Sequence, residues 1–313
     1  MEWIFYTLYA ATGFGVLSVI AKNIMQDTSA EIYTALYSFL GLIFYSPVFL
    51  YYFLNSGINF TALSLTALGA SMIGNVLAFT VYNYSVKEGQ LSRVIPMTRL
   101  TPIFAAAIAA LVLGEKVDLQ LAVGILLATS GAVIVLKEKH ISYLKSVEDG
   151  LHVKALQAAV LSSVLYGATS VADRYATQII QPEIYNFFIF TGLTTGLMTL
   201  AYLKFQNPGE KIISTFKEYP GLYTLTGLIA ATATLAIFKA FSQASAAQVT
   251  TVQQFQVLIP VISGVILFDE GELLRKLAGS IVLIAGIGLT AIGERFKKIG
   301  LPNLFRSAAL AQR

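Results

Sequence analysis

Apolar residues in this chain occur in long tracts, and charged residues are concentrated in the gaps between them. Of the 313 residues, 56% are hydrophobic and 12% are charged, which argues against a soluble domain. Each tract has about 20 residues, the length that an α-helix needs to cross roughly 30 Å of hydrocarbon. The ten tracts are 3–24, 31–53, 64–86, 91–113, 119–136, 154–178, 184–203, 219–243, 246–268 and 276–293. They predict an all-α integral membrane protein with ten transmembrane helices.

Several segments of the sequence occur twice in the same order, which predicts an internal repeat. The offset between the copies is 152 residues for the early matches and 155 residues for the late ones, so one small insertion separates them. The matches are 14–22 with 166–174, Glu31-Ile32-Tyr33 with Glu183-Ile184-Tyr185, and Glu115, Gly124 and Gly131 with Glu270, Gly279 and Gly286.

The repeat divides the chain into two copies of five spans each. We expect a first repeat at 1–137, a connector at 138–153, a second repeat at 154–294 and a basic tail at 295–313. An odd number of crossings makes the second copy enter the membrane from the opposite side, so the two repeats are expected to be inverted. Inverted repeats suit alternating access to a shared site. A helix bundle with a purely structural role is the alternative.

Polar residues inside the predicted spans are candidates for substrate binding. Arg99 lies about six residues, or roughly 9 Å, inside the fourth span. A charge at such a depth costs around 2.5–3.5 kcal/mol, so Arg99 is expected to face a cavity or a partner. In the repeat it corresponds to Gln254, so a polar patch recurs in both copies. The candidate substrate-binding residues are Arg99, Gln253, Gln254, Lys239, Gln256, Arg93, Asn75, Tyr82 and Tyr84.

Each of these candidates also has a structural interpretation. Arg99 could form an ion pair, and Arg93, nearer its helix end, could snorkel to the interface. The glutamines could join helix to helix, and the tyrosines could belong to an interfacial belt. If Arg99 and Lys239 both face a pathway, cations near its two ends predict an anionic or zwitterionic substrate.

Charged residues near the span ends are a separate group. Asp173 and Arg174 could take part in proton coupling or balance charge, although a solvated or structural role is the favoured interpretation this near a span end. As sequence neighbours they do not face each other on a helix. Glu115 and Glu270 follow apolar spans and are interpreted as boundary or gating residues rather than substrate ligands.

Prolines and glycines predict where the spans bend and where they approach one another. Pro96, Pro102 and Pro260 remove backbone hydrogen bonds and should kink or hinge their helices. Two glycine pairs lie seven residues apart on nearly one helix face, which favours close packing within a repeat or across a dimer. These pairs are Gly124 with Gly131 and Gly279 with Gly286.

Catalytic and metal-binding motifs are not found in the sequence. The chain has no Cys, and His140 and His152 lack metal-ligand spacing. No P-loop, HExxH or Ser/His/Asp pattern is present, so we expect no enzyme activity, metal or cofactor, and any active transport should be secondary. The expected partners are a small-molecule substrate and the lipid bilayer, with no nucleic acid, and a homodimer is left open.

The stretch from Val94 to Val135 resembles the EamA domain of the drug/metabolite transporter superfamily. It contains the proline-led helix Pro102-Ile-Phe-Ala-Ala-Ala-Ile, the motif Leu113-Gly114-Glu115 and a helix with two glycines, and the second repeat echoes it through Phe268-Asp269-Glu270. In the second copy Pro260 lies one helical turn later than the position equivalent to Pro102, and Asp269 replaces the glycine.

The resemblance covers about 290 residues and implies a ten-helix multi-pass carrier in the cell membrane with both termini cytoplasmic. It also implies a central cavity lined by spans one, three, four, six, eight and nine. Counting Lys and Arg in the loops favours the opposite orientation.

From the inverted repeat and the family resemblance we expect a secondary transporter that exports small polar metabolites. A lipid-linked flippase, a non-transporting scaffold or sensor, and an intramembrane enzyme are the alternatives.

Overall fold

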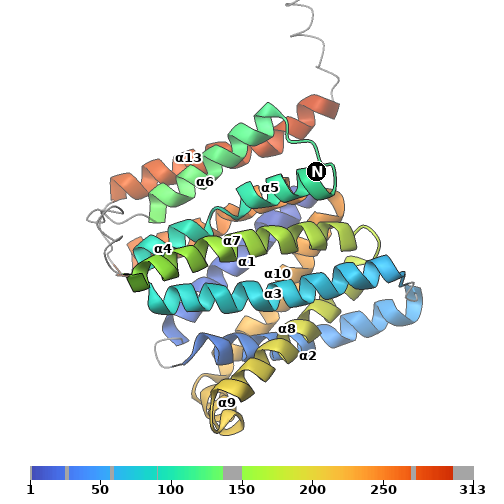
Figure 1. Ribbon diagram of the computed structural model, residues 1–313, viewed down its shortest axis with the longest axis vertical. Helices are drawn as coiled ribbons and strands as arrows, with labels where there is room; N and C mark the ends of the chain where they lie inside the picture. Colours follow the sequence, from blue (N-terminus) through green and yellow to red (C-terminus); the bar gives the residue numbers. More distant parts are fainter. Residues whose placement is uncertain are drawn as a thin grey trace, which may run out of the picture.

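The chain folds into a bundle of helices. The computed structural model describes residues 2–24, 28–56, 60–89, 91–136, 150–268 and 273–298, and its regular structure in these ranges is helical (Figure 1). The helices are α1 (Glu2–Ile24), α2 (Ala30–Ser56), α3 (Ala62–Glu88), α4 (Leu91–Thr98), α5 (Thr101–Val112), α6 (Leu119–Leu136), α7 (Gly150–Ala176), α8 (Pro182–Lys204), α9 (Pro208–Glu218), α10 (Pro220–Gln243), α11 (Ala246–Gln253), the 3-10 helix η2 (Gln254–Val257), α12 (Leu258–Phe268) and α13 (Leu273–Lys298). The predicted all-α class is confirmed.

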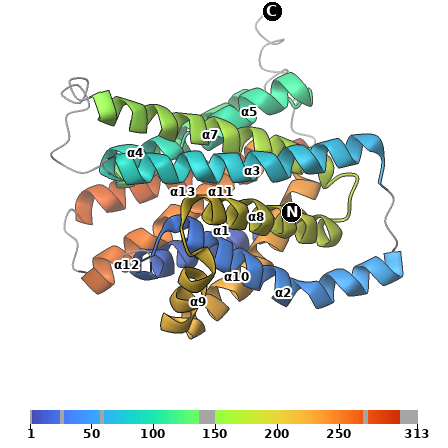
Figure 2. The same ribbon diagram turned by 60° about the horizontal axis from the view of Figure 1, so that its bottom comes forward.

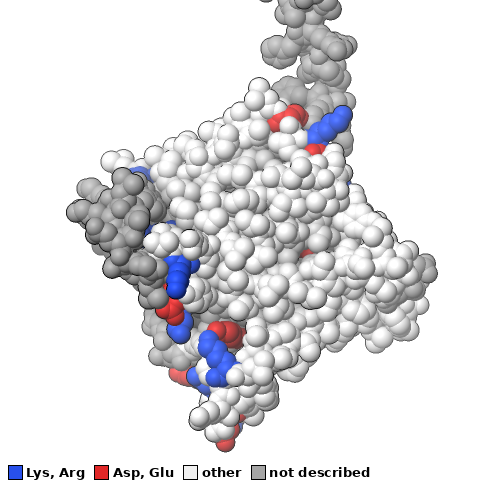
Figure 3. All heavy atoms as spheres, in the orientation of Figure 1, with Lys and Arg blue, Asp and Glu red and all other residues white. Residues whose placement is uncertain are grey.

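Nine helical segments among the described residues are long and apolar enough to cross a membrane. They correspond to nine of the ten predicted spans. The remaining span, 246–268, is divided into α11, η2 and α12, so it is not one continuous helix. On the face of the molecule that Figure 3 shows, most of the surface is free of charged groups, which gather at the left edge, around α9 and at the upper right. This distribution is the one that a multi-pass membrane protein requires.

Two boundaries differ from those expected, and one helix is additional. Helix α7 begins at Gly150, inside the expected connector, and α13 continues to Lys298, inside the expected tail. Helix α9 was not predicted, because its 11 residues are too short and too polar to give a spanning tract. Asp269, Glu270, His140 and the tail beyond Lys298 lie outside the described residues.

Helices α6 and α13, the last of each repeat, pack against each other in antiparallel directions. A Cβ atom on Gly124 would lie 3.1 Å from the Gly286 carbonyl oxygen, and one on Gly131 would lie 2.7 Å from that of Gly279. Gly124 corresponds to Gly279 in the repeat, and Gly131 to Gly286, so each contact is the image of the other. The repeats are therefore related by a two-fold axis perpendicular to these helices, which is an inversion across the membrane. The four glycines join the two repeats rather than helices within one repeat.

The other helix contacts follow the same symmetry (Figures 1 and 2). Helix α3 packs against α7, and its counterpart α10 packs against α1; α2 packs against α8. Helix α5 contacts α7, and α12 contacts α1. The α6 and α13 pair lies at one edge of the bundle in Figure 1. This position agrees with the family resemblance, which does not include spans five and ten among those that line the central cavity.

The fourth span breaks between α4 and α5 because of Pro102. Proline has no N–H to donate to the carbonyl four residues earlier, which here belongs to Thr98. The Thr101 hydroxyl donates to this oxygen instead, at 3.0 Å. The helix stops at Thr98 and restarts at Thr101, with Arg99 and Leu100 in the turn.

The ninth span breaks at the equivalent point. Pro260 offers no N–H to the Gln256 carbonyl, and residues 254–257 tighten into η2. Helix α11 ends at Gln253, the repeat equivalent of Thr98, where α4 ends. The two breaks therefore coincide although Pro260 lies one turn later than the position equivalent to Pro102.

Candidate functional site

Arg99 lies in the break of the fourth span, within electrostatic range of a tyrosine on each of two neighbouring helices. Its guanidinium interacts electrostatically with the hydroxyls of Tyr82 on α3 and Tyr166 on α7. The side chain is partly buried, and its Nε atom has no hydrogen-bond partner among the described residues. None of the ion pairs between described residues includes Arg99. The site thus offers a cation and two hydroxyls to an anionic group.

Gln254 joins the two broken spans at this site. Its side-chain Nε2 donates to the backbone carbonyl of Arg99 at 2.7 Å, and the residue is 3% exposed. Arg99 and Gln254 are equivalent in the repeat, and residues that contact their own equivalents lie close to the two-fold axis. The backbone of Arg99 in one repeat and the side-chain amide of Gln254 in the other therefore meet near the centre of the inverted symmetry.

Other candidates lie near this centre or on the same span. Gln253 and Gln256 are partly buried on either side of Gln254. The Gln256 carbonyl lies so near α1 that a Cβ atom on Gly15 would be 2.9 Å from it. Arg93 is partly buried on α4. Nothing in the structure tests whether these residues touch a substrate, so their roles stay predictions.

Three predicted binding residues lie away from Arg99. Tyr84 is 43% exposed and, two residues after Tyr82, points about 200° away around α3. Asn75 donates to the Ser71 carbonyl and hydroxyl at 2.9 and 3.1 Å. Lys239 forms an ion pair with Glu183 at 2.9 Å, so its charge is already compensated.

Glu115 and Arg174 form an ion pair at the N-terminal face of the bundle. We define this face as the one that carries the start of α1, the α5–α6 loop and the α10–α11 junction. Arg174 Nε donates to Glu115 Oε1 at 3.2 Å, and Arg174 Nη1 donates to the Phe241 carbonyl at 2.6 Å. The backbone N–H of Ala246 donates to Glu115 Oε2 at 3.2 Å. Because Ala246 is the first residue of α11, the carboxylate also meets the positive end of that helix. One carboxylate thus connects spans four, six and nine.

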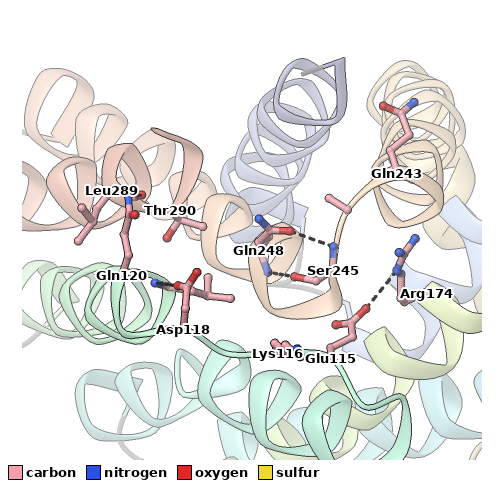
Figure 4. A pocket seen from close by; sticks show the side chains of 12 residues that line it. Glu115, Lys116, Asp118, Gln120, Arg174, Gln243, Ser245, Gln248, Leu289 and Thr290 are labelled. Carbon is pink, nitrogen blue, oxygen red and sulfur yellow. Dashed lines mark hydrogen bonds and ion pairs between the residues drawn. The ribbon is translucent and has the colours of Figure 1, made fainter. Parts of the chain in front are cut away.

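Backbone geometry places Glu115 at this junction. Gly114 ends α5 in a left-handed conformation (φ 64°) that favours glycine, and the chain turns there. Figure 4 shows Glu115 pointing toward Arg174, with Ser245 and Gln248 forming the capping box at the start of α11. The depression at this face has a volume of about 330 Å³. We call the Glu115, Arg174 and Ala246 contacts the N-face lock.

Asp173, beside Arg174, is not solvated. The side chain is 6% exposed and accepts hydrogen bonds from Ser71 on α3 and Tyr185 on α8. The favoured sequence interpretation included a solvated role, and the structure excludes it because α7 turns Asp173 toward two neighbouring helices.

Sequence reasoning missed Tyr166, Ser71 and Tyr185. Tyr166 corresponds to Phe14 in the repeat, and that difference between the copies was a usable signal. Ser71 gave no signal of its own, because serine is common in membrane helices, and the recurrence of Tyr33 as Tyr185 was interpreted only as evidence of the repeat. Among the described residues no group of three His, Asp or Glu side chains could hold a metal ion.

The fold and site define a multi-pass helical membrane protein of two inverted repeats with equivalent breaks in two spans, an architecture typical of secondary transporters. The model of the EamA-like transporter family matches residues 1–137 and 153–292. The chain belongs to this family, and is therefore a membrane transporter of the drug/metabolite transporter type. No curated protein matches it. One protein crystal structure shares the fold with a TM-score of 0.74 and 13% identity, over 93% of this chain and 99% of that chain.

Proposed function

We propose that this protein is a secondary active transporter that exports small polar metabolites carrying a carboxylate or phosphate, such as amino-acid-like compounds. The observation that carries the proposal is Arg99, a cation in a broken span without an ion-pair partner among the described residues. Placing an unpaired charge inside a membrane-spanning segment costs considerable free energy. An anionic substrate would supply the missing partner, and Tyr82 and Tyr166 would add hydroxyl contacts.

The position of this site near the two-fold axis supports alternating access. A site at the centre of inverted repeats is reached equally well from either face when one repeat rocks against the other. The N-face lock would have to break each time the N-terminal face opens. We place both termini in the cytoplasm of a cell-membrane protein on the basis of the family resemblance, although the Lys and Arg count favours the reverse.

Replacing Arg99 should weaken recognition of the anionic group. Arg99→Gln removes a charge-assisted hydrogen bond worth about 1.5–3 kcal/mol, which corresponds to roughly a 10- to 100-fold loss of affinity. The measurement is counterflow in proteoliposomes with a panel of amino acids, nucleobases and sugar phosphates, together with the shift in melting temperature on ligand addition. Arg99→Lys should retain part of the affinity, because the charge remains.

Two tyrosines on α3 form a matched control pair for this experiment. Tyr82→Phe removes a hydroxyl beside Arg99 and should weaken binding, whereas Tyr84→Phe changes a residue on the opposite side of the helix and should not. Unchanged transport of every accepted compound by Arg99→Gln would exclude Arg99 from the site. If no panel compound competes and only lipid-linked compounds do, the flippase is favoured, and if nothing binds, the protein is not a metabolite carrier.

A further inference from the structure

A buried acidic side chain lies where three helices meet near the N-terminal face. Asp173 on α7 is 6% exposed, and the side chains beside it, Ser71 on α3 and Tyr185 on α8, are fully buried. Asp173 Oδ1 accepts from the Ser71 hydroxyl and, at 2.6 Å, from the Tyr185 hydroxyl. Asn75 donates to the Ser71 hydroxyl at 3.1 Å. Two neutral hydroxyls thus contact the carboxyl group, and a neutral amide contacts one of these hydroxyls.

The charged residues nearest to Asp173 neutralise one another in pairs. Arg174, the next residue, is paired with Glu115 at 3.2 Å. Lys239 on α10 is paired with Glu183 at 2.9 Å. The described parts of α3, α5 and α11 bring no other charged side chain to this end of the bundle, since the charges of α3 are at its far end (Lys87 and Glu88) and α5 and α11 have none.

We propose that Asp173 is a proton-binding site whose occupancy is linked to closure of the N-terminal face. An ionised carboxylate that is removed from water loses its hydration, and hydrogen bonds from two hydroxyls replace only part of it. The closed structure therefore binds a proton at Asp173 more tightly than a state in which water reaches the carboxyl group. When the N-terminal face opens, water reaches Asp173, its O–H bond breaks, and the proton passes to water on that face.

The link to closure is the position of Asp173 on the same turn as the N-face lock. Hydrogen bonds from Arg174 connect α7 to the α5–α6 loop and to α10. The hydrogen bonds that Asp173 accepts connect α7 to α3 and α8. Opening must move the end of α7 away from some of these neighbours and expose the carboxyl group. By linkage, a proton that binds the closed state more tightly favours that state as pH falls.

The test uses cysteine labelling, which the Cys-free chain permits without background. This inference rests on the proposed alternation between states. The labelling needs no substrate, so the proton site can be tested even if no transported compound is found. Ala246→Cys, at a fully buried position in the N-face lock, reports opening to a membrane-impermeant maleimide. Gln181→Cys, exposed on the same face, corrects for the pH dependence of thiol reactivity.

We expect the corrected labelling rate of Ala246→Cys to fall as pH is lowered from about 8 to about 5, by up to tenfold per unit for one fully coupled proton. Adding Asp173→Asn, which keeps the acceptor oxygen but cannot ionise, should give slow labelling at every pH. Adding Tyr185→Phe removes a hydrogen bond to the carboxylate and should move the transition to higher pH.

Two results would overturn the proposal. One is a corrected rate that does not depend on pH, and the other is a pH dependence that persists in Asp173→Asn. Protonation of Glu115 would weaken the N-face lock and raise labelling at low pH, so the direction of the change distinguishes the two acids. Glu2→Gln, a change at an exposed acid of α1 on the same face, should leave the pH profile unchanged, and size-exclusion chromatography of each variant checks its folding.

Discussion

Gly286→Ala should strongly destabilise the protein, whereas Gly288→Ala, two residues later on α13, should not. A Cβ atom at Gly286 would lie 2.3 Å from the Ala128 backbone nitrogen and 2.7 Å from the Gly124 carbonyl oxygen. Backbone atoms cannot rotate aside, so α6 and α13 would have to separate. Overpacking of this kind costs about 1–3 kcal/mol, and we expect the upper part of that range because the contact joins the two repeats.

Gly288 is the matched control because a Cβ atom there would meet nothing within 4 Å. Ala also favours the helix over Gly by up to about 1 kcal/mol, so Gly288→Ala should be neutral or slightly stabilising. The measurement is the free energy of unfolding of each variant in the same detergent. Equal stability of the two variants would contradict the tight α6–α13 contact and, with it, the antiparallel packing from which the inversion is inferred.

The fold was largely predictable because its determinants are spread along the sequence. Apolar tracts set the spans, and the repeat of Gly124 and Gly131 as Gly279 and Gly286 predicted the two copies. Counting five spans per copy then predicted the inversion. The break in the ninth span was harder to predict, since Pro260 is displaced from the position equivalent to Pro102, and only the backbone shows that both helices end at the same place.

The candidate site was less predictable because it depends on contacts between distant segments. Arg99 could be found from its depth in a span, but its neighbours Tyr82 and Tyr166 come from two other helices. Lys239 has the same sequence signature as Arg99, an isolated cation in an apolar tract, and only the fold shows that Glu183 neutralises it. Periodicity reports which residues are apolar, not which polar residue pairs with which.

Breaking the N-face lock should open the N-terminal face. The Glu115 and Arg174 side chains are 17% and 15% exposed, so their ion pair is better shielded than a surface pair. Removing one partner leaves the other charge uncompensated, and contacting residues of this kind have interaction energies of about 0.5–3 kcal/mol. Glu115→Gln or Arg174→Gln should therefore raise the labelling rate of Ala246→Cys by up to about 100-fold.

The double variant separates the ion pair from the other contacts of its members. If the charges act on each other, Glu115→Gln with Arg174→Gln should raise labelling by less than the product of the single effects, because neither partner is then left as an unpaired charge. Lys204→Gln removes the partner of Glu31 on the opposite face and should not raise labelling at Ala246→Cys. In a rocking bundle, weakening the opposite face favours its opening and so closes the N-terminal face further. Faster labelling in Lys204→Gln would mean that the bundle loosens as a whole, and the lock would then be a packing contact rather than a gate.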